Sequence, residues 1–71
     1  MSLTIGEKLR VVLKRKDISV QDLADMLGQS RQNINTKIKK DNFSEQDIRK
    51  IAKVLNVGFE AVFILEDGER I

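Results

Sequence analysis

Cysteine and histidine are both absent from the 71-residue chain. Without cysteine the protein can form neither a disulfide bond nor a thiolate metal site, which fits a reducing, cytoplasmic compartment. Zinc sites and acid–base catalysis at neutral pH depend largely on histidine and cysteine, so the composition argues against most hydrolytic and metal chemistry. We therefore predict a protein that is not an enzyme and that uses no cofactor and no metal.

Long apolar runs are missing as well. The longest one, Ala61 to Leu65, is far too short to span a bilayer, and no basic start followed by an apolar core marks a signal peptide. Hydrophobic residues make up 41% and charged residues 34% of the chain, as in ordinary globular proteins. A chain of this length buries only about 60% of its unfolded surface, so a second subunit would add stability. We predict a single small cytoplasmic domain without a membrane partner.

Positive charge is concentrated in the first part of the chain. Residues 1–40 hold nine Lys and Arg against four Asp and Glu, which gives +5, whereas residues 41–71 hold four against seven, which gives −3. Such a split is expected when one face meets an anionic polymer and another meets solvent or a partner. A chance asymmetry in a small protein is the alternative.

Four helices are predicted from their start signals and their apolar spacing. A hydroxyl three residues before a carboxylate resembles a capping box at Thr4–Glu7, Ser19–Asp22 and Ser44–Asp47, and Ser30 is a further N-cap without an acidic partner. Apolar residues then recur at intervals of three and four. The expected helices run from Thr4 to about Lys16, from Val20 to Leu27, from Arg31 to about Lys40 and from Glu45 to Leu55. Gly28 and Asn56 are expected to end the second and fourth.

The last residues follow a different pattern. Residues 59–65 are rich in β-branched and aromatic side chains, and Asp67-Gly68 is a strong two-residue turn signal. We predict a short C-terminal β-hairpin, with a fifth helix beginning after Gly58 as the alternative. An isolated hairpin is marginal in water, so it should pack on the helices or pair with a second copy. Phe59 and Phe63 would form an exposed apolar patch if they faced solvent, which favours a homodimer through this segment.

The third predicted helix has one face that is entirely polar or basic. Its only apolar residues are Ile34 and Ile38. At 100° per residue the opposite side holds Gln32, Thr36, Lys39 and Lys40, flanked by Asn33 and Asn35. Glutamine and asparagine can bond adenine bidentately, arginine can bond guanine, and a threonine methyl can touch thymine. Residues 30–40 contain four cations and no anion, whereas a merely solvated face, the alternative, more often mixes both signs.

Two short helices joined through Gly28-Gln29-Ser30 can hold one helix across a phosphate backbone while the next enters a major groove. The stretch from Ile18 to Ile34, with its spacing of Leu-Ala, Leu-Gly and Ser-Arg-Gln, resembles the core signature of the phage repressor and Cro family, also called the xenobiotic-response-element family. The similarity continues through residues 48–57 and covers about residues 5–58. It implies a mainly α fold: a compact lambda-repressor-like bundle of four or five helices that binds operator DNA as a dimer.

The polar face and the resemblance together give the expected contacts with double-stranded DNA. Base contacts are assigned to Arg31, Gln32, Asn35 and Thr36. Phosphate contacts are assigned to Ser19, Gln21, Ser30, Asn33, Lys37, Lys39 and Lys40. We predict a sequence-specific transcriptional regulator of the repressor type, with residues 1–58 as the DNA-binding domain and residues 59–71 as a dimerisation element. The alternative is a protein-interaction module on the same fold, such as an antitoxin, an adaptor or an anti-repressor component.

Three positions depart from the family pattern. Val20 stands where many relatives have a glutamine that braces a phosphate, and Gln21 is a candidate substitute. Leu13 and Ile38 stand where some phage relatives have a buried Arg–Glu ion pair. Because both are apolar, no charge is stranded, and such an exchange is often neutral or stabilising by about 1–4 kcal/mol. The departure is therefore compatible with the fold.

Overall fold

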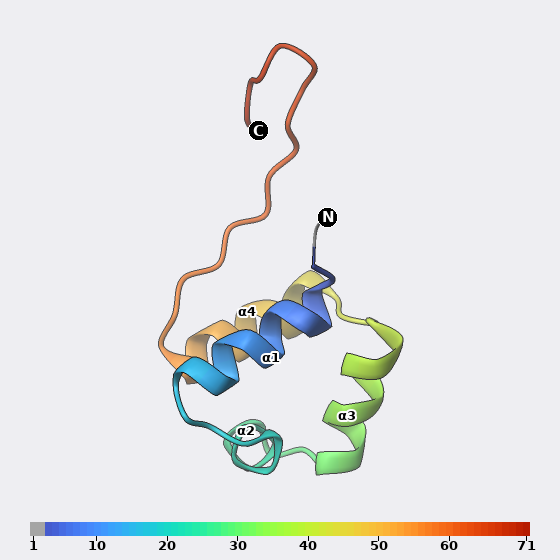
Figure 1. The fold of residues 1–71 in the computed structure, drawn as a ribbon, viewed down its shortest axis with the longest axis vertical. Coiled ribbons are helices and arrows are strands. Elements are labelled where there is room, and N and C mark those ends of the chain that lie inside the picture. Colours follow the sequence, from blue (N-terminus) through green and yellow to red (C-terminus); the bar gives the residue numbers. More distant parts are fainter. Residues whose placement is uncertain (1–2) are drawn as a thin grey trace.

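The computed structural model describes residues 3–71; Met1 and Ser2, to which the sequence assigned no role, lie outside the described residues. Four helices follow one another in this part of the chain. They are α1 (Ile5–Arg15), α2 (Val20–Leu27), α3 (Arg31–Lys40) and α4 (Glu45–Leu55). The helices form one bundle, and the residues after α4 extend away from it (Figure 1). The predicted mainly α bundle with a helix-turn-helix is confirmed.

Each helix begins at the predicted hydroxyl N-cap. Thr4, Ser19 and Ser44 each complete a capping box, in which the hydroxyl and the acidic side chain three residues later bond reciprocally to backbone N–H groups. The Ser30 hydroxyl accepts a hydrogen bond of 3.1 Å from the backbone N–H of Asn33. Helices this short are marginal in isolation, and a capping side chain contributes about 1 kcal/mol. Local sequence therefore fixes where all four start.

Three helices end at a residue in the left-handed conformation. Gly28 has φ of 68° and Asn56 has φ of 57°, as their positions predicted. Asp41 ends α3 with φ of 51°, a role that was not predicted from the sequence. Aspartate is one of the few residues other than glycine that tolerates this conformation.

The core draws apolar residues from all four helices. Its buried members are Leu9, Leu13, Leu23, Ala24, Ile34, Ile38, Ile51, Ala52 and Leu55. Leu13 and Ile38 are 4% and 7% exposed, so the two positions where some relatives carry an ion pair belong to this apolar core. Among the described residues no polar or charged residue is buried. Hydrophobic burial therefore supplies the main stabilisation of the bundle.

The start of α1 approaches the end of α3 closely at Gly6, which has no side chain. A Cβ atom added to Gly6 would lie 2.7 Å from the carbonyl oxygen of Ile38, closer than real Cβ atoms approach. Next to this contact, the Gly6 N–H donates a 2.9 Å hydrogen bond to the Asp41 carboxylate. Two residues 35 apart in sequence thus join the start of α1 to the end of α3.

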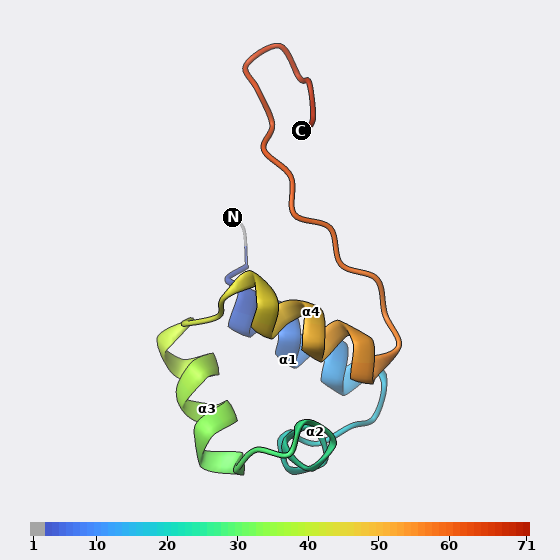
Figure 2. The ribbon, with the colours of Figure 1, turned by 180° about the vertical axis from the view of Figure 1, so that it is seen from behind.

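Residues 57–71 form an extended segment, here called the arm, that projects from the bundle (Figures 1 and 2). At its tip Phe63 and Ile71 exchange backbone hydrogen bonds of 2.7 and 2.9 Å, and Ile64 forms an antiparallel bridge with Arg70. The predicted hairpin is therefore present in minimal form, and the alternative of a fifth helix is wrong. Residues 60–71 are all exposed, so the hairpin does not pack on the helices.

Candidate nucleic-acid interface

The turn between α2 and α3 sets the direction of the third helix. Gly28 donates to the carbonyl of Asp25 and Gln29 donates to that of Ala24, at 3.2 and 2.9 Å. This pair of bonds is the Schellman arrangement, which needs a left-handed residue at the position of Gly28. Ser30 follows directly as the N-cap of α3. Three residues are thus enough to end α2 and begin α3 in a new direction (Figure 1).

Of the four residues with predicted base contacts, Gln32 and Thr36 lie on the outer side of α3, Asn35 lies on its flank, and Arg31 lies at its first position. Ile34 and Ile38 anchor the helix on the core, being 1% and 7% exposed. The predicted base-contacting residues are exposed (Arg31, Gln32, Thr36) or half-buried (Asn35). The hydrogen bonds and ion pairs described for residues 3–71 use none of these four side chains. They are therefore available to an external partner.

Four of the seven predicted phosphate contacts lie at the starts of α2 and α3, and the three lysines lie in the last turn of α3. Ser19 and Ser30 are the two N-caps, each accepting from a backbone N–H. Gln21 donates to Asp25 at 2.9 Å, and the Asn33 side chain donates to Gln29 at 2.7 Å across the turn. Helix N-termini carry unpaired backbone N–H groups and the positive end of the helix dipole, which favour anions.

The lysines of α3 differ in their surroundings. Lys39 and Lys40 are exposed in the last turn, whereas Lys37 is half-buried. The Lys37 Nζ atom lies 3.2 Å from Oδ1 of Asp47, at the start of α4. A phosphate at Lys37 would have to compete with this carboxylate, so Lys39 and Lys40 carry more of the positive potential of the helix.

The Asp47 carboxylate is itself stabilised in its charged form. The backbone N–H of Ser44 donates to it at 3.0 Å, which is the largest cause of a lowered pKa of Asp47. Partial burial opposes the shift, and hydrogen bonding and charge attraction from Lys37 add to it. Asp47 thus serves both as the capping acid of α4 and as an ion-pair partner of α3.

These contacts tie α3 to three neighbouring parts of the fold, one from its first turn, one from its last turn and one from its C-cap. Asn33 binds the preceding turn, Lys37 binds α4, and Asp41 binds α1. Sequence reasoning missed the last two, because each joins residues from different helices and leaves no local pattern. Their effect is to fix the orientation of the exposed polar face relative to the bundle.

A comparison with protein-family models matches residues 8–68 to the Cro/C1-type helix-turn-helix DNA-binding domain. The chain belongs to this family. It is therefore a DNA-binding regulator in the general sense, as the resemblance in residues 18–34 predicted. The match reaches beyond residue 58, so most of the arm lies within the Cro/C1-type domain.

Two further observations bear on the family assignment. Searches of curated proteins and of solved structures gave no match. Of the helices in residues 3–71, none combines the length and apolar character that crossing a membrane requires. The Cro/C1-type assignment thus rests on the family model together with the helix-turn-helix geometry described above.

Proposed function

We propose that this Cro/C1-type protein is a sequence-specific transcriptional repressor that binds operator DNA as a homodimer, with α3 in the major groove. The observation that carries the proposal is the outer face of α3, where amide side chains and cations stand without any anion. Side chains of these types match the donor and acceptor patterns of base edges in the major groove. Repression follows simply, because occupying a duplex site excludes other proteins from it.

The proposed contacts divide into those that read sequence and those that position the protein. Arg31 and Gln32, in the first turn of α3, would meet base edges together with Asn35 and Thr36. The positioning contacts would come from Ser19, Gln21, Ser30, Asn33, Lys37, Lys39 and Lys40. Phosphate contacts release counterions, so affinity should fall steeply with salt.

A homodimer fits the size of the protein and the symmetry of operators. Two copies would place their α3 helices about 34 Å apart, one turn of the duplex, on the same face of the DNA. In this proposal residues 1–58 bind DNA, and residues 59–71 within the arm hold the two copies together. The exposed apolar side chains of the arm support that role.

Matched lysine variants test whether α3 faces DNA. Binding to a random duplex is measured by fluorescence anisotropy over a series of salt concentrations for Lys39→Ala and Lys53→Ala. Lys53 is an exposed lysine in the last turn of α4, at the end away from α3 (Figures 1 and 2). Lys39→Ala should lower the slope of log K against log salt by about 1, while Lys53→Ala should leave it unchanged. Equal slopes for the two variants would contradict the proposal.

The exposed arm favours one other function, a protein-interaction module such as an antitoxin, an adaptor or an anti-repressor component. Apolar surface of this kind usually meets a protein partner. That function predicts no duplex binding by the native chain even at low salt, so the same titration separates the two. Neither function involves catalysis, a cofactor or a metal ion.

A further inference from the structure

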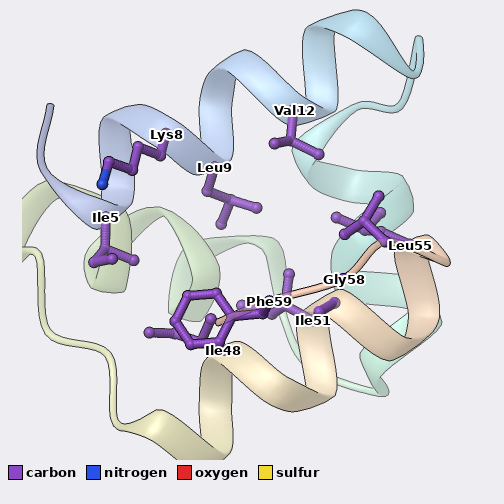
Figure 3. A pocket seen from close by; sticks show the side chains of 11 residues that line it. Ile5, Lys8, Leu9, Val12, Ile48, Ile51, Leu55, Gly58 and Phe59 are labelled. Carbon is purple, nitrogen blue, oxygen red and sulfur yellow. The ribbon is translucent and has the colours of Figure 1, made fainter. Parts of the chain in front are cut away.

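An apolar groove lies between α1 and α4. Its volume is about 230 Å³, and its walls include Leu9 and Val12 of α1, Ile48 and Leu55 of α4, and Phe59 at the base of the arm (Figure 3). None of the residues that line it belongs to α2 or α3. Whatever occupies this groove would therefore leave the proposed DNA-binding face free.

The arm carries exposed apolar side chains that could fill the groove. Phe63, Ile64 and Ile71 at the tip are 79%, 66% and 65% exposed. A two-stranded hairpin without a packed apolar face is marginally stable in water. The arm therefore gains stability from any apolar surface against which it can lie.

The charges of the arm and of α1 are complementary. In α1, four cations and one anion give +3; they are Lys8, Arg10, Lys14, Arg15 and Glu7. In the arm, four anions and one cation give −3; they are Glu60, Glu66, Asp67, Glu69 and Arg70. Opposite charges of this size speed the association of an arm with an α1 helix and disfavour partners of like charge. Lys8, the one charged residue that lines the groove, would meet the acidic arm first.

We propose that the groove between α1 and α4 receives the arm of a second copy, which receives the first arm in return. The inference rests on the proposed homodimer and adds where the arm binds. A reciprocal exchange is an isologous interface, which closes at two copies. It would cover the apolar tip and the groove of both copies at once.

The fold favours another copy's arm over the chain's own. Phe59 already lines the groove from its own chain, and beyond it the arm runs outward (Figures 1 and 2). Folding back would require a reversal just after Phe59, while the bonds between Phe63 and Ile71 keep the tip a hairpin. An arm that enters from another molecule needs no such reversal.

Disulfide cross-linking tests this contact directly, because the native chain has no cysteine. Chains carrying Lys8→Cys and chains carrying Phe63→Cys, one of them with a mass tag, are mixed without DNA and oxidised with oxidised glutathione. A disulfide needs Cα atoms about 4.4–6.8 Å apart, so it reports close contact. The expected product is the mixed dimer, and Gln32→Cys on α3 replaces Lys8→Cys in the control mixture.

Every other product overturns the proposal. Dominant Phe63→Cys homodimers would mean that arms pair with arms. In a chain that carries both Lys8→Cys and Phe63→Cys, a closed monomer without disulfide-linked dimers would mean that each arm binds its own groove. Mixed dimers no more abundant than in the Gln32→Cys control would mean that the groove is not the site. Since no DNA is present, a failure here is distinct from a failure of duplex binding.

Sedimentation gives a second measurement, one that does not depend on disulfide formation. Phe63→Ser should weaken the dimer at least about tenfold, because a phenylalanine side chain leaves its apolar contact. Val11→Ser removes another exposed apolar side chain, one on α1 that does not line the groove, and should leave the dimer unchanged. Helical circular dichroism should be the same for both. Unchanged dimerisation of Phe63→Ser would overturn the proposal.

Discussion

The carboxylate of Asp41, at the end of α3, accepts a 2.9 Å hydrogen bond from the backbone N–H of Gly6, in the first turn of α1. The bond places a negative charge at the positive end of α1 and satisfies one of its unpaired amides. It also ties α3, the helix proposed to face DNA, to α1 at the start of the bundle. The orientation of the exposed polar face of α3 thus depends on a residue outside that face.

Asp41→Ala should destabilise the domain by about 1–2 kcal/mol. The variant removes a charge-assisted hydrogen bond and puts alanine in a left-handed conformation. Asp41→Asn keeps an oxygen acceptor and tolerates that conformation, so its loss should be clearly smaller. Urea denaturation of both variants measures the difference. A loss for Asp41→Asn as large as that for Asp41→Ala would contradict this account of Asp41.

Gly6→Ala should also be destabilising, against the usual trend. Alanine in place of glycine inside a helix normally gains about 0.5–1 kcal/mol. At Gly6 the new methyl would meet the Ile38 carbonyl at 2.7 Å, a backbone atom that cannot move aside alone. Overpacking of this kind costs about 1–3 kcal/mol. Gly58→Ala is the control, since no atom lies within 4 Å of its Cβ position, and its melting temperature should not fall.

Leu13→Arg should unfold the domain. Leu13 is 4% exposed in the apolar core, and the arginine that some phage relatives carry here needs an acidic partner where this chain has Ile38. A buried charge without a partner costs about 3–5 kcal/mol, a large share of the stability of so small a domain. Val11→Arg adds the same side chain at an exposed position of α1 and should fold normally. Native-like helical circular dichroism for Leu13→Arg would contradict the burial of Leu13 in the core.

Asp47 should make the domain less stable in acid. The pKa of its carboxyl is lowered from the ordinary value of 3.8, first by the Ser44 N–H and further by Lys37. The stability gained from the charged form is complete above that ordinary value and is lost as pH falls through the lowered pKa. Asp47→Asn should be less stable at neutral pH but show a flatter decline below about pH 4. Parallel curves for the two proteins in urea titrations between pH 2 and 6 would contradict this role.

The features that could be predicted from the sequence are those set by residues close together in the chain. The four helix starts follow from Thr4, Ser19, Ser30 and Ser44, since each cap bonds within three residues of itself. The exposed face of α3 followed from periodicity, and the hairpin followed from Asp67-Gly68. These features need no knowledge of which helices meet.

Contacts between helices could not be read in the same way. The bond between Gly6 and Asp41 and the ion pair between Lys37 and Asp47 join separate elements. Lys37 therefore looked like a free cation in the sequence, although it is partly neutralised in the fold. The projection of the arm had no local signal either, because the same apolar residues could have packed on the bundle.

The most direct test of the account is selection from a pool of random duplexes by the purified protein, at low and at moderate salt. We predict enrichment of a two-fold symmetric motif, and a loss of about 1–3 kcal/mol in discrimination at one base pair of each half-site in Gln32→Ala. Gln46→Ala changes an exposed glutamine on α4 and should leave the motif intact. No enriched motif even at low salt, or equal effects of the two substitutions, would contradict the claim that α3 reads DNA sequence.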